Sequence, residues 1–176
     1  DNTAPSAPNA LSLNDPASSP GNDTTPTITV GGVVSGDTIA LYDDAACSNT
    51  ALSSGTASGT SIDLTSSALV EGSYTFYAKA TDSLGNASDC STASVAYELD
   101  LTAPSVTGLA DETTPATSAS WSWGCSESPC TYAYVIDTSS ATDPGDSYAS
   151  TVMASQSTGT GTYYIHVRSK DAAGNL

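Results

Sequence analysis

Basic residues are nearly absent from this chain, which has 3 Lys and Arg against 19 Asp and Glu in 176 residues, for a net charge of −16. A surface of that sign repels the phosphates of nucleic acids and of anionic membranes, so the charge argues against both as partners. The chain also has a single histidine, His166, and no Ser or Cys nucleophile is recognisably placed beside it. We therefore expect His166 to be a surface residue of a strand and predict that these residues form no enzyme.

Long apolar stretches are missing as well. No segment is long enough to span a bilayer, and no signal-peptide pattern stands at Asp1, so we expect the sequence to begin inside a longer protein. Helical periodicity stands out nowhere, whereas short runs of alternating apolar residues recur between turn residues. With 38% hydrophobic residues the cores must be thin, but nine Tyr and two Trp argue against a disordered chain.

What the chain does contain is an internal repeat. The pattern Gly-[Ser/Thr]-Tyr-x-x-x-[Ala/Val]-[Lys/Arg]-x-x-Asp-x-x-Gly-Asn occurs at residues 72–86 and again at 161–175. A second pattern, Asp-x-Thr-Ala-Pro, opens at Asp1 and again at Asp100. The repeat predicts two tandem modules, residues 1–99 and 100–176. Arrays of small β modules usually provide reach rather than chemistry.

The alternation predicts an all-β chain in which each module packs two antiparallel sheets of seven strands in total. The expected strands of the first module are residues 10–14, 26–30, 38–42, 50–53, 61–65, 73–81 and 93–99. In the sixth of these, Tyr74, Phe76, Ala78 and Ala80 should face the core, because the opposite register would bury Lys79 unpaired.

In the second module we expect strands at residues 131–138 and 162–170, and a strand in which Trp121, Trp123 and Cys125 share one face. That shared face favours core packing of the two tryptophans over an exposed platform for stacking sugars. The chain stops directly after the second copy of the long pattern, so the second module should lack its last strand.

An odd number of strands makes the chain enter a module at one pole and leave it at the other. The Asp-x-x-Gly-Asn turn precedes the last strand, so it should lie at the N-terminal pole of its module, where the Asp-x-Thr-Ala-Pro linker also lies. Tyr74 and Tyr163 stand near the start of a late strand, a position typical of the structural tyrosine corner.

Four cysteines are distributed as one pair in each module, which predicts the disulfides Cys47–Cys90 and Cys125–Cys130 and an oxidising compartment. Zinc is a poor alternative, because there is no Cys-x-x-Cys and only one His. Three expected strands separate Cys47 from Cys90, which would place them at opposite poles. Either residues 50–53 are not a full strand, or one of the two cysteines lies in the middle of a strand.

Asp1-Asn2-Thr3-Ala4-Pro5, the Tyr74 strand and Asp82-Ser83-Leu84-Gly85-Asn86 resemble bacterial immunoglobulin-like tandem repeats of large secreted or surface adhesins. The resemblance covers residues 1–99, whereas the second module resembles a shorter immunoglobulin-like or fibronectin type III-like unit. It implies two tandem immunoglobulin-like β-sandwiches, and it implies calcium at the junctions between modules.

The candidate calcium ligands are oxygen-bearing side chains of the two repeated motifs. They are Asp1, Asp82 and Asn86 in one cluster, and Asp100, Asp171 and Asn175 with Glu98 in the other. Calcium takes six to eight oxygen ligands, which such side chains could supply together with carbonyls and water. The alternative is that Asp and Asn cap tight turns by bonding to their own backbone, while Gly85 and Gly174 supply positive φ.

The resulting functional hypothesis is a stalk or spacer of a bacterial cell-surface or secreted adhesin, located outside the cell or in the periplasm. It would be a monomer whose partners are neighbouring repeats, and it would hold a binding tip away from the cell. Two alternatives stay open. The modules could themselves bind a glycan or protein, or they could be accessory domains of a secreted enzyme.

Overall fold

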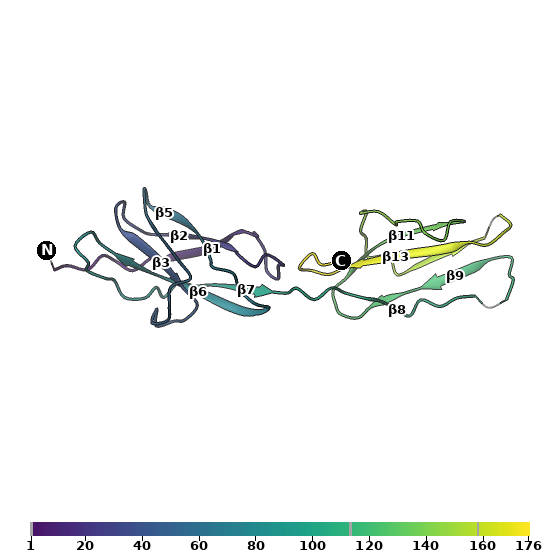
Figure 1. Ribbon diagram of the computed structural model, residues 1–176, viewed down its shortest axis with the longest axis horizontal. Helices are drawn as coiled ribbons and strands as arrows, with labels where there is room; N and C mark the ends of the chain where they lie inside the picture. Colours follow the sequence, from purple (N-terminus) through teal and green to yellow (C-terminus); the bar gives the residue numbers. More distant parts are fainter. Residues whose placement is uncertain (1, 113, 158) are drawn as a thin grey trace. The chain divides into compact units, whose positions relative to one another are not determined.

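The computed structural model describes residues 2–112, 114–157 and 159–176 (Figure 1). Contacts divide the chain into two units, Asp1–Asp100 and Leu101–Leu176. The regular elements in the described residues are β-strands, so the all-β prediction is confirmed. No described helix is long and apolar enough to cross a membrane.

The first unit is a sandwich of a three-stranded and a four-stranded antiparallel sheet. The smaller sheet has the order β1-β2-β5, made of Ala10–Asp15, Thr27–Gly31 and Ser61–Thr65. The larger sheet has the order β4-β3-β6-β7, made of Ser53–Thr56, Thr38–Tyr42, Gly72–Thr81 and Val95–Leu99. The first unit therefore has seven strands, the expected number.

One strand position was wrong. We expected a strand at residues 50–53, whereas β4 occupies Ser53–Thr56. The reason is the turn before it, where the Asp44 carboxylate accepts hydrogen bonds from the backbone N–H groups of Ser48 and Asn49. The chain returns to the edge of β3 only at Leu52, whose N–H donates to the Leu41 carbonyl at 2.8 Å.

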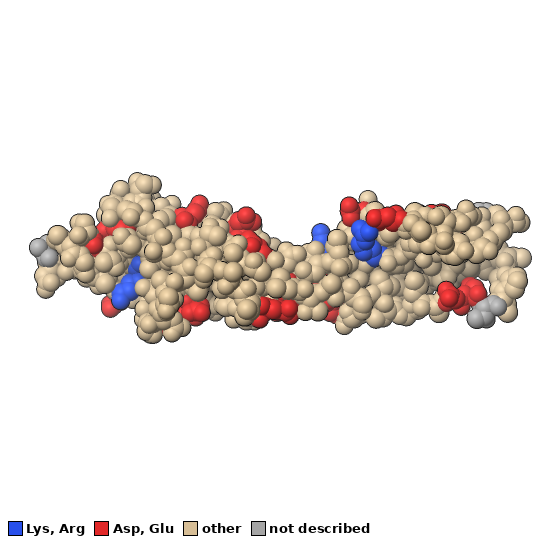
Figure 2. Space-filling view, in the orientation of Figure 1, with Lys and Arg blue, Asp and Glu red and all other residues tan. Residues whose placement is uncertain are grey.

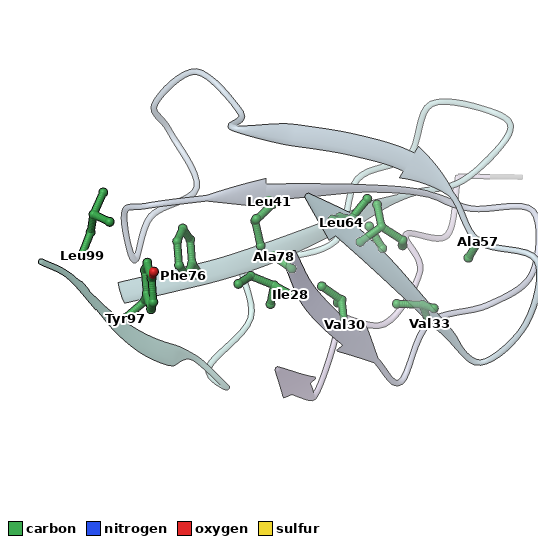
Figure 3. Packing of buried hydrophobic residues seen from close by; sticks show 12 residues of the cluster. Ile28, Val30, Val33, Leu41, Ala57, Leu64, Phe76, Ala78, Tyr97 and Leu99 are labelled. Carbon is green, nitrogen blue, oxygen red and sulfur yellow. The ribbon is translucent and has the colours of Figure 1, made fainter. Parts of the chain in front are cut away.

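The core of the first unit lies between the two sheets, where alternate residues of each strand point inward (Figure 3). On β6, Phe76, Ala78 and Ala80 are buried while Lys79 is half-buried on the other face, as predicted. The buried cluster is Ile28, Val30, Val33, Ile39, Leu41, Ala57, Leu64, Phe76, Ala78, Ala80, Tyr97 and Leu99. Strand β7 closes this core, since Tyr97 and Leu99 are each only 1% exposed.

Two tyrosines fix the ends of strands to the loops of the first unit. The Tyr74 hydroxyl donates to the carbonyl of Val70, four residues earlier, at 2.8 Å, which is the hydrogen bond of a tyrosine corner. The Tyr97 hydroxyl donates to the Asp23 carbonyl at 2.8 Å, and burial raises the pKa of this phenol. Both hydroxyls thus stabilise the fold by hydrogen bonds to loop carbonyls.

The disulfide Cys47–Cys90 forms, with a Cα–Cα distance of 5.5 Å. After the turn at residues 82–86 the chain runs back along β6, where the N–H groups of Ser88 and Ser91 donate to the carbonyls of Ala80 and Ala78. Cys90 lies between these serines, so it lies level with the part of β6 that pairs with the end of β3. Cys47 lies in the turn region that follows β3, which ends at Tyr42. Neither cysteine lies within a strand, and β4 begins only at Ser53, so the first of the two expected explanations is correct.

The second unit is built from short pairs of antiparallel strands. Strand β8 (Val106–Thr107) pairs with β10 (Gly124–Cys125), β9 (Ala119–Ser122) with β12 (Met153–Gln156), and β11 (Thr131–Asp137) with β13 (Tyr164–Lys170). The described residues of this unit hold six strands in three two-stranded sheets, not one sandwich of seven.

The strand expected around Trp121 and Trp123 divides at Trp123, because its two halves have different partners. Trp123 is the point of division, and its N–H donates to the Val152 carbonyl at 3.0 Å. The strand expected at 162–170 begins at Tyr164, since Gly159 and Gly161 before it have φ values of 96° and 128°, outside the strand region.

The core of the second unit is small and aromatic. Trp123 is 5% exposed and packs with its ring centroid 6.3 Å from that of Tyr132 and 5.3 Å from that of Tyr134. The disulfide Cys125–Cys130 joins the end of β10 to the start of β11 beside it. Core packing is thus confirmed for Trp123, whereas Trp121 is only half-buried.

Candidate functional site

The first acidic motif forms a closed turn between β6 and the returning chain. The Asp82 carboxylate accepts hydrogen bonds from the backbone N–H groups of Leu84 at 2.9 Å and Asn86 at 2.8 Å, and from the Asn86 side-chain amide at 2.8 Å. The Asp82 N–H in turn donates to the Asn86 carbonyl at 3.0 Å, and Gly85 has a φ of 87°. The Asn86 side chain is the main cause that lowers the pKa of Asp82.

The second motif repeats this geometry. The Asp171 carboxylate accepts from the N–H groups of Gly174 at 2.6 Å and Asn175 at 2.8 Å, and from the Asn175 side-chain amide at 2.9 Å. The Asp171 N–H donates to the Asn175 carbonyl at 3.2 Å. A carboxylate offers about four lone-pair positions, and three of them are occupied here. In both units the repeated Asp and Asn cap their own turn.

Of the remaining candidate ligands, Glu98 and Asp100 do not join the first turn. Asp1 lies outside the described residues. Glu98 is exposed on β7 and pairs with Ser73 at the start of β6, whereas Asp82 follows the end of β6. Asp100 is the last residue of the first unit, and its N–H donates to the Gly21 carbonyl at 3.0 Å.

Within the second unit a carboxylate that the motif analysis missed lies close to Asp171. Carboxylate oxygens of Glu127 and Asp171 lie within 4.8 Å of one another. Glu127 belongs to the short loop closed by Cys125–Cys130, so no spacing in the sequence relates it to a residue some forty positions later. The pair provides two oxygens that could face one cation, and Asp171 is 9% exposed.

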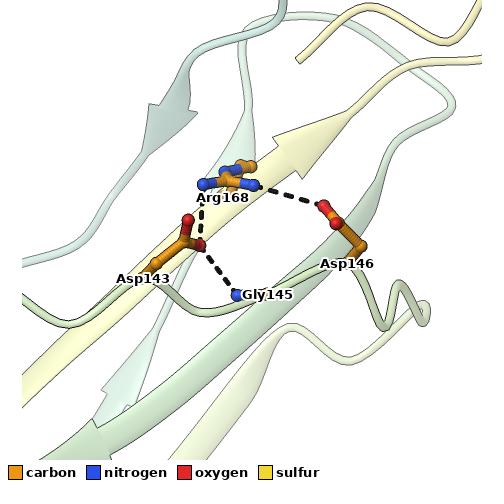
Figure 4. A network of polar contacts seen from close by, with 4 residues as sticks. All are labelled: Asp143, Gly145, Asp146 and Arg168. Atoms are coloured by element: carbon orange, nitrogen blue, oxygen red, sulfur yellow. Dashed lines mark hydrogen bonds and ion pairs between the residues drawn. The ribbon is translucent and has the colours of Figure 1, made fainter.

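Charged side chains on β13 hold the long loop that follows β11 (Figure 4). Arg168 pairs with Asp143 at 2.7 Å and with Asp146 at 3.3 Å. The Gly145 N–H also donates to the Asp143 carboxylate, and this bond together with Arg168 lowers the pKa of Asp143. Elsewhere Figure 2 shows acidic side chains scattered over the surface and few basic ones.

The single histidine also serves this loop. His166 Nε2 lies 2.9 Å from the Ser139 carbonyl oxygen and 3.6 Å from an Asp137 carboxylate oxygen. The position is that of a strand residue packed under a loop, half-buried rather than fully at the surface. Its partners are a carbonyl and a carboxylate, which orient the ring and offer no nucleophile for it to activate.

A cavity of about 690 Å³ opens in the second unit beside Trp121. One wall comes from β9 and β12, with Trp121 and Gln156, and the other from residues 159–163, with Tyr163. The lining is otherwise made of small Ser, Thr, Ala and Gly side chains with Pro115 and Glu112. The half-buried Trp121 therefore borders an open space and does not complete a closed core.

Comparisons with known proteins support the immunoglobulin-like assignment in the first unit. Residues 17–101 match the family model of the bacterial Ig-like domain. No curated protein matches the chain.

Among solved structures, the fibronectin(III)-like modules of Clostridium thermocellum CbhA are 16% identical at a TM-score of 0.46, over 94% of this chain and 88% of theirs. The central fibronectin-III array of RIM-binding protein is 14% identical at 0.35, over 97% of this chain and 59% of that one. Dimeric latent PorU from Porphyromonas gingivalis is 16% identical at 0.31, over 99% of this chain and 18% of that one.

Proposed function

We propose, from the match of residues 17–101 to the bacterial Ig-like domain, that the chain supplies spacer modules of a bacterial cell-surface or secreted adhesin. In this role the modules hold a binding tip away from the cell and carry out no catalysis. The observation that carries the proposal is that the candidate functional side chains bond to the protein's own turns and loops. The repeated Asp and Asn cap their own turns, and the one histidine and Arg168 hold a loop.

The two disulfides support a location outside the cytoplasm. Each joins residues of the same unit, so each restrains that unit's own unfolded chain. On the loop-entropy relation, bridges with separations of 43 and 5 residues stabilise by about 4 and about 2 kcal/mol. Such bonds persist in oxidising compartments, which suits a protein displayed at the cell surface.

Calcium binding belongs to the proposal and rests on the acidic composition and on the pair Glu127 and Asp171. A calcium ion that binds this pair in the native state, and does not bind the unfolded chain, would stabilise the second unit. At a free calcium concentration a hundred times the Kd, the gain is about 2.7 kcal/mol. We expect calcium to raise the unfolding temperature seen by tryptophan fluorescence, and Glu127→Gln to reduce that gain. Glu112→Gln, at an exposed glutamate of the same unit, is the matched control. An identical unfolding temperature in millimolar calcium and in chelator would contradict calcium binding here.

A second candidate function is ligand binding by the second unit itself. The observation that favours it is Trp121, half-buried at the edge of a cavity of about 690 Å³ that also contains Gln156 and Tyr163. An aromatic ring with polar neighbours is suited to a glycan or a peptide.

Competition for adhesion separates the two functions. Cells that display the parent adhesin are allowed to attach to their target surface in the presence of excess purified chain. A spacer has no contact with the target, so attachment should be unchanged. Inhibition by the chain that is lost in Trp121→Ala would instead show that the second unit binds the target.

A further inference from the structure

In the first unit, hydrogen bonds join β7 to a short segment of the chain between β1 and β2. The Gly21 N–H donates to the Glu98 carbonyl at 3.0 Å, and the Asp100 N–H donates to the Gly21 carbonyl at 3.0 Å. The Ser19 hydroxyl accepts a hydrogen bond from the Glu98 N–H at 2.8 Å. The bridge at Gly21 is parallel, so this segment, residues 19–21, runs in the same direction as β7.

The 19–21 segment is also packed closely against β7. A Cβ atom at Gly21 would lie 2.9 Å from the Tyr97 hydroxyl and 2.9 Å from Cγ of Pro16, so a side chain there would displace one of them. The Tyr97 hydroxyl in turn donates to the Asp23 carbonyl at 2.8 Å. On its other edge β7 pairs with β6 along its whole length. Strand β7 is therefore held on both edges.

The parallel direction decides how this pair responds to tension. A pull on the chain before β1 reaches the 19–21 segment at its N-terminal end, and a pull from the second unit reaches β7 at its C-terminal end. In a parallel pair these two ends lie at opposite ends of the pair, so the pull slides the two segments past each other. Because the hydrogen bonds cross between the segments, they bear the load together and do not break one after another.

The disulfide Cys47–Cys90 keeps part of the first unit out of the path of the load. Strands β4, β5 and β6 lie between the two cysteines in the sequence, and the bond transmits tension directly from one cysteine to the other. These strands are therefore not stretched while the bond is intact. The sequence separation of 43 residues would add about 150 Å of extension, at about 3.5 Å per residue, if the bond were absent.

We propose that the 19–21 segment and β7 form a clamp that resists tension along the chain, and that Cys47–Cys90 limits how far the first unit extends when the clamp opens. The inference rests on the proposed spacer function and deepens it, because a spacer between a cell and its target transmits tension. Forced unfolding is governed by the unfolding rate. The hydrogen bonds of the clamp therefore set the lifetime of the unit under load, whereas bonds inside the disulfide loop are still intact when the clamp opens.

The test stretches the full chain by its two ends at constant force in an atomic force microscope. The unfolding step of the first unit is the one that lengthens by about 150 Å in the variant Cys47→Ala with Cys90→Ala. Ser19→Ala removes the hydroxyl that accepts the Glu98 N–H. Loss of one such hydrogen bond should raise the unfolding rate of this unit about two- to tenfold at a fixed force.

Ser88→Ala is the matched control. The Ser88 hydroxyl is buried inside the disulfide loop and accepts a hydrogen bond from the Ala80 N–H at 3.0 Å. Since this site is buried and that of Ser19 is exposed, Ser88→Ala should lower stability in urea at least as much as Ser19→Ala. Under force, however, Ser88→Ala should leave the unfolding rate unchanged.

Two results would overturn the clamp: no acceleration under force in Ser19→Ala, or equal acceleration in Ser19→Ala and Ser88→Ala. A step of the same length with and without Cys47–Cys90 would overturn the limit on extension. These measurements use the purified chain and no target surface. Failure of the clamp is therefore distinguishable from failure of the spacer function, which is decided by attachment of cells.

Discussion

The disulfide Cys47–Cys90 should supply a large share of the stability of the first unit. The perturbation is the double substitution Cys47→Ala with Cys90→Ala, which opens a loop with a sequence separation of 43 while leaving both sheets intact. Loop entropy assigns this closure about 4 kcal/mol. Domains of this size have a free energy of unfolding of only about 5–15 kcal/mol. The variant should therefore stay folded, but with little free energy of unfolding left.

The expected change in unfolding temperature follows from the size of the unit. For a domain of about 100 residues, 1 kcal/mol shifts the unfolding temperature by roughly 4–8 °C. The double variant should therefore unfold roughly 15–30 °C below the parent chain.

The aromatic residues allow each unit to be observed separately in the full chain. The one phenylalanine, Phe76, is fully buried in the first unit, so 4-fluorophenylalanine gives a single ¹⁹F reporter of that unit. Both tryptophans, Trp121 and Trp123, belong to the second unit, so their fluorescence reports its unfolding. The control is Cys125→Ala with Cys130→Ala, which should shift the fluorescence transition and leave the fluorine transition in place.

Two results would refute this reasoning. A loss below about 1 kcal/mol in the ¹⁹F transition would mean that the bond does not restrain the unfolded chain as loop entropy requires. An equal shift of the fluorescence and fluorine transitions would mean that the two units do not unfold separately.

Two further predictions concern the first unit. Tyr74→Phe removes the hydrogen bond to Val70 and should cost about 1 kcal/mol in urea unfolding, whereas Tyr77→Phe on the other face of β6 should cost much less; equal losses would count against a tyrosine corner. Asp82 has a folded-state pKa below its ordinary 3.8, so its contribution is complete above that pH and is lost as the pH falls through the lowered value. Unfolding followed between pH 2 and about 5 should therefore depend less on pH in Asp82→Asn, and an unchanged profile would contradict the stabilising turn.

Local sequence patterns predicted most of the first unit. Alternation on β6 is decisive there, because Lys79 and Phe76 cannot exchange faces without burying a charge. The position of β4 was missed because it depends on the hydrogen bonds of Asp44 in the preceding turn. The course of the chain back along β6, which explains Cys90, depends on the hydroxyls of Ser88 and Ser91. Such serines carry no signal in a hydrophobic pattern.

The second unit was less predictable, for a physical reason. Its strands are short, and β12 has the sequence Met-Ala-Ser-Gln, in which the methionine is 66% exposed. A strand with so little apolar burial is defined by its partner rather than by its own residues. The candidate sites also divide into features that local sequence predicts and features that depend on tertiary contacts. The turns around Asp82 and Asp171 follow from a local motif, whereas the proximity of Glu127 to Asp171 depends on tertiary structure.

The central claim is that these modules provide spacing and not recognition, and a domain replacement tests it most directly. In the protein as displayed on cells, residues 1–176 are replaced by two unrelated β-sandwich domains of similar length, and attachment of the cells to a target surface is measured at equal surface display. The account predicts attachment equal to that of the unmodified protein, and reduced attachment when the segment is deleted without replacement. Attachment that is lost in the replacement protein, although display is normal, would contradict the account and assign recognition to these residues.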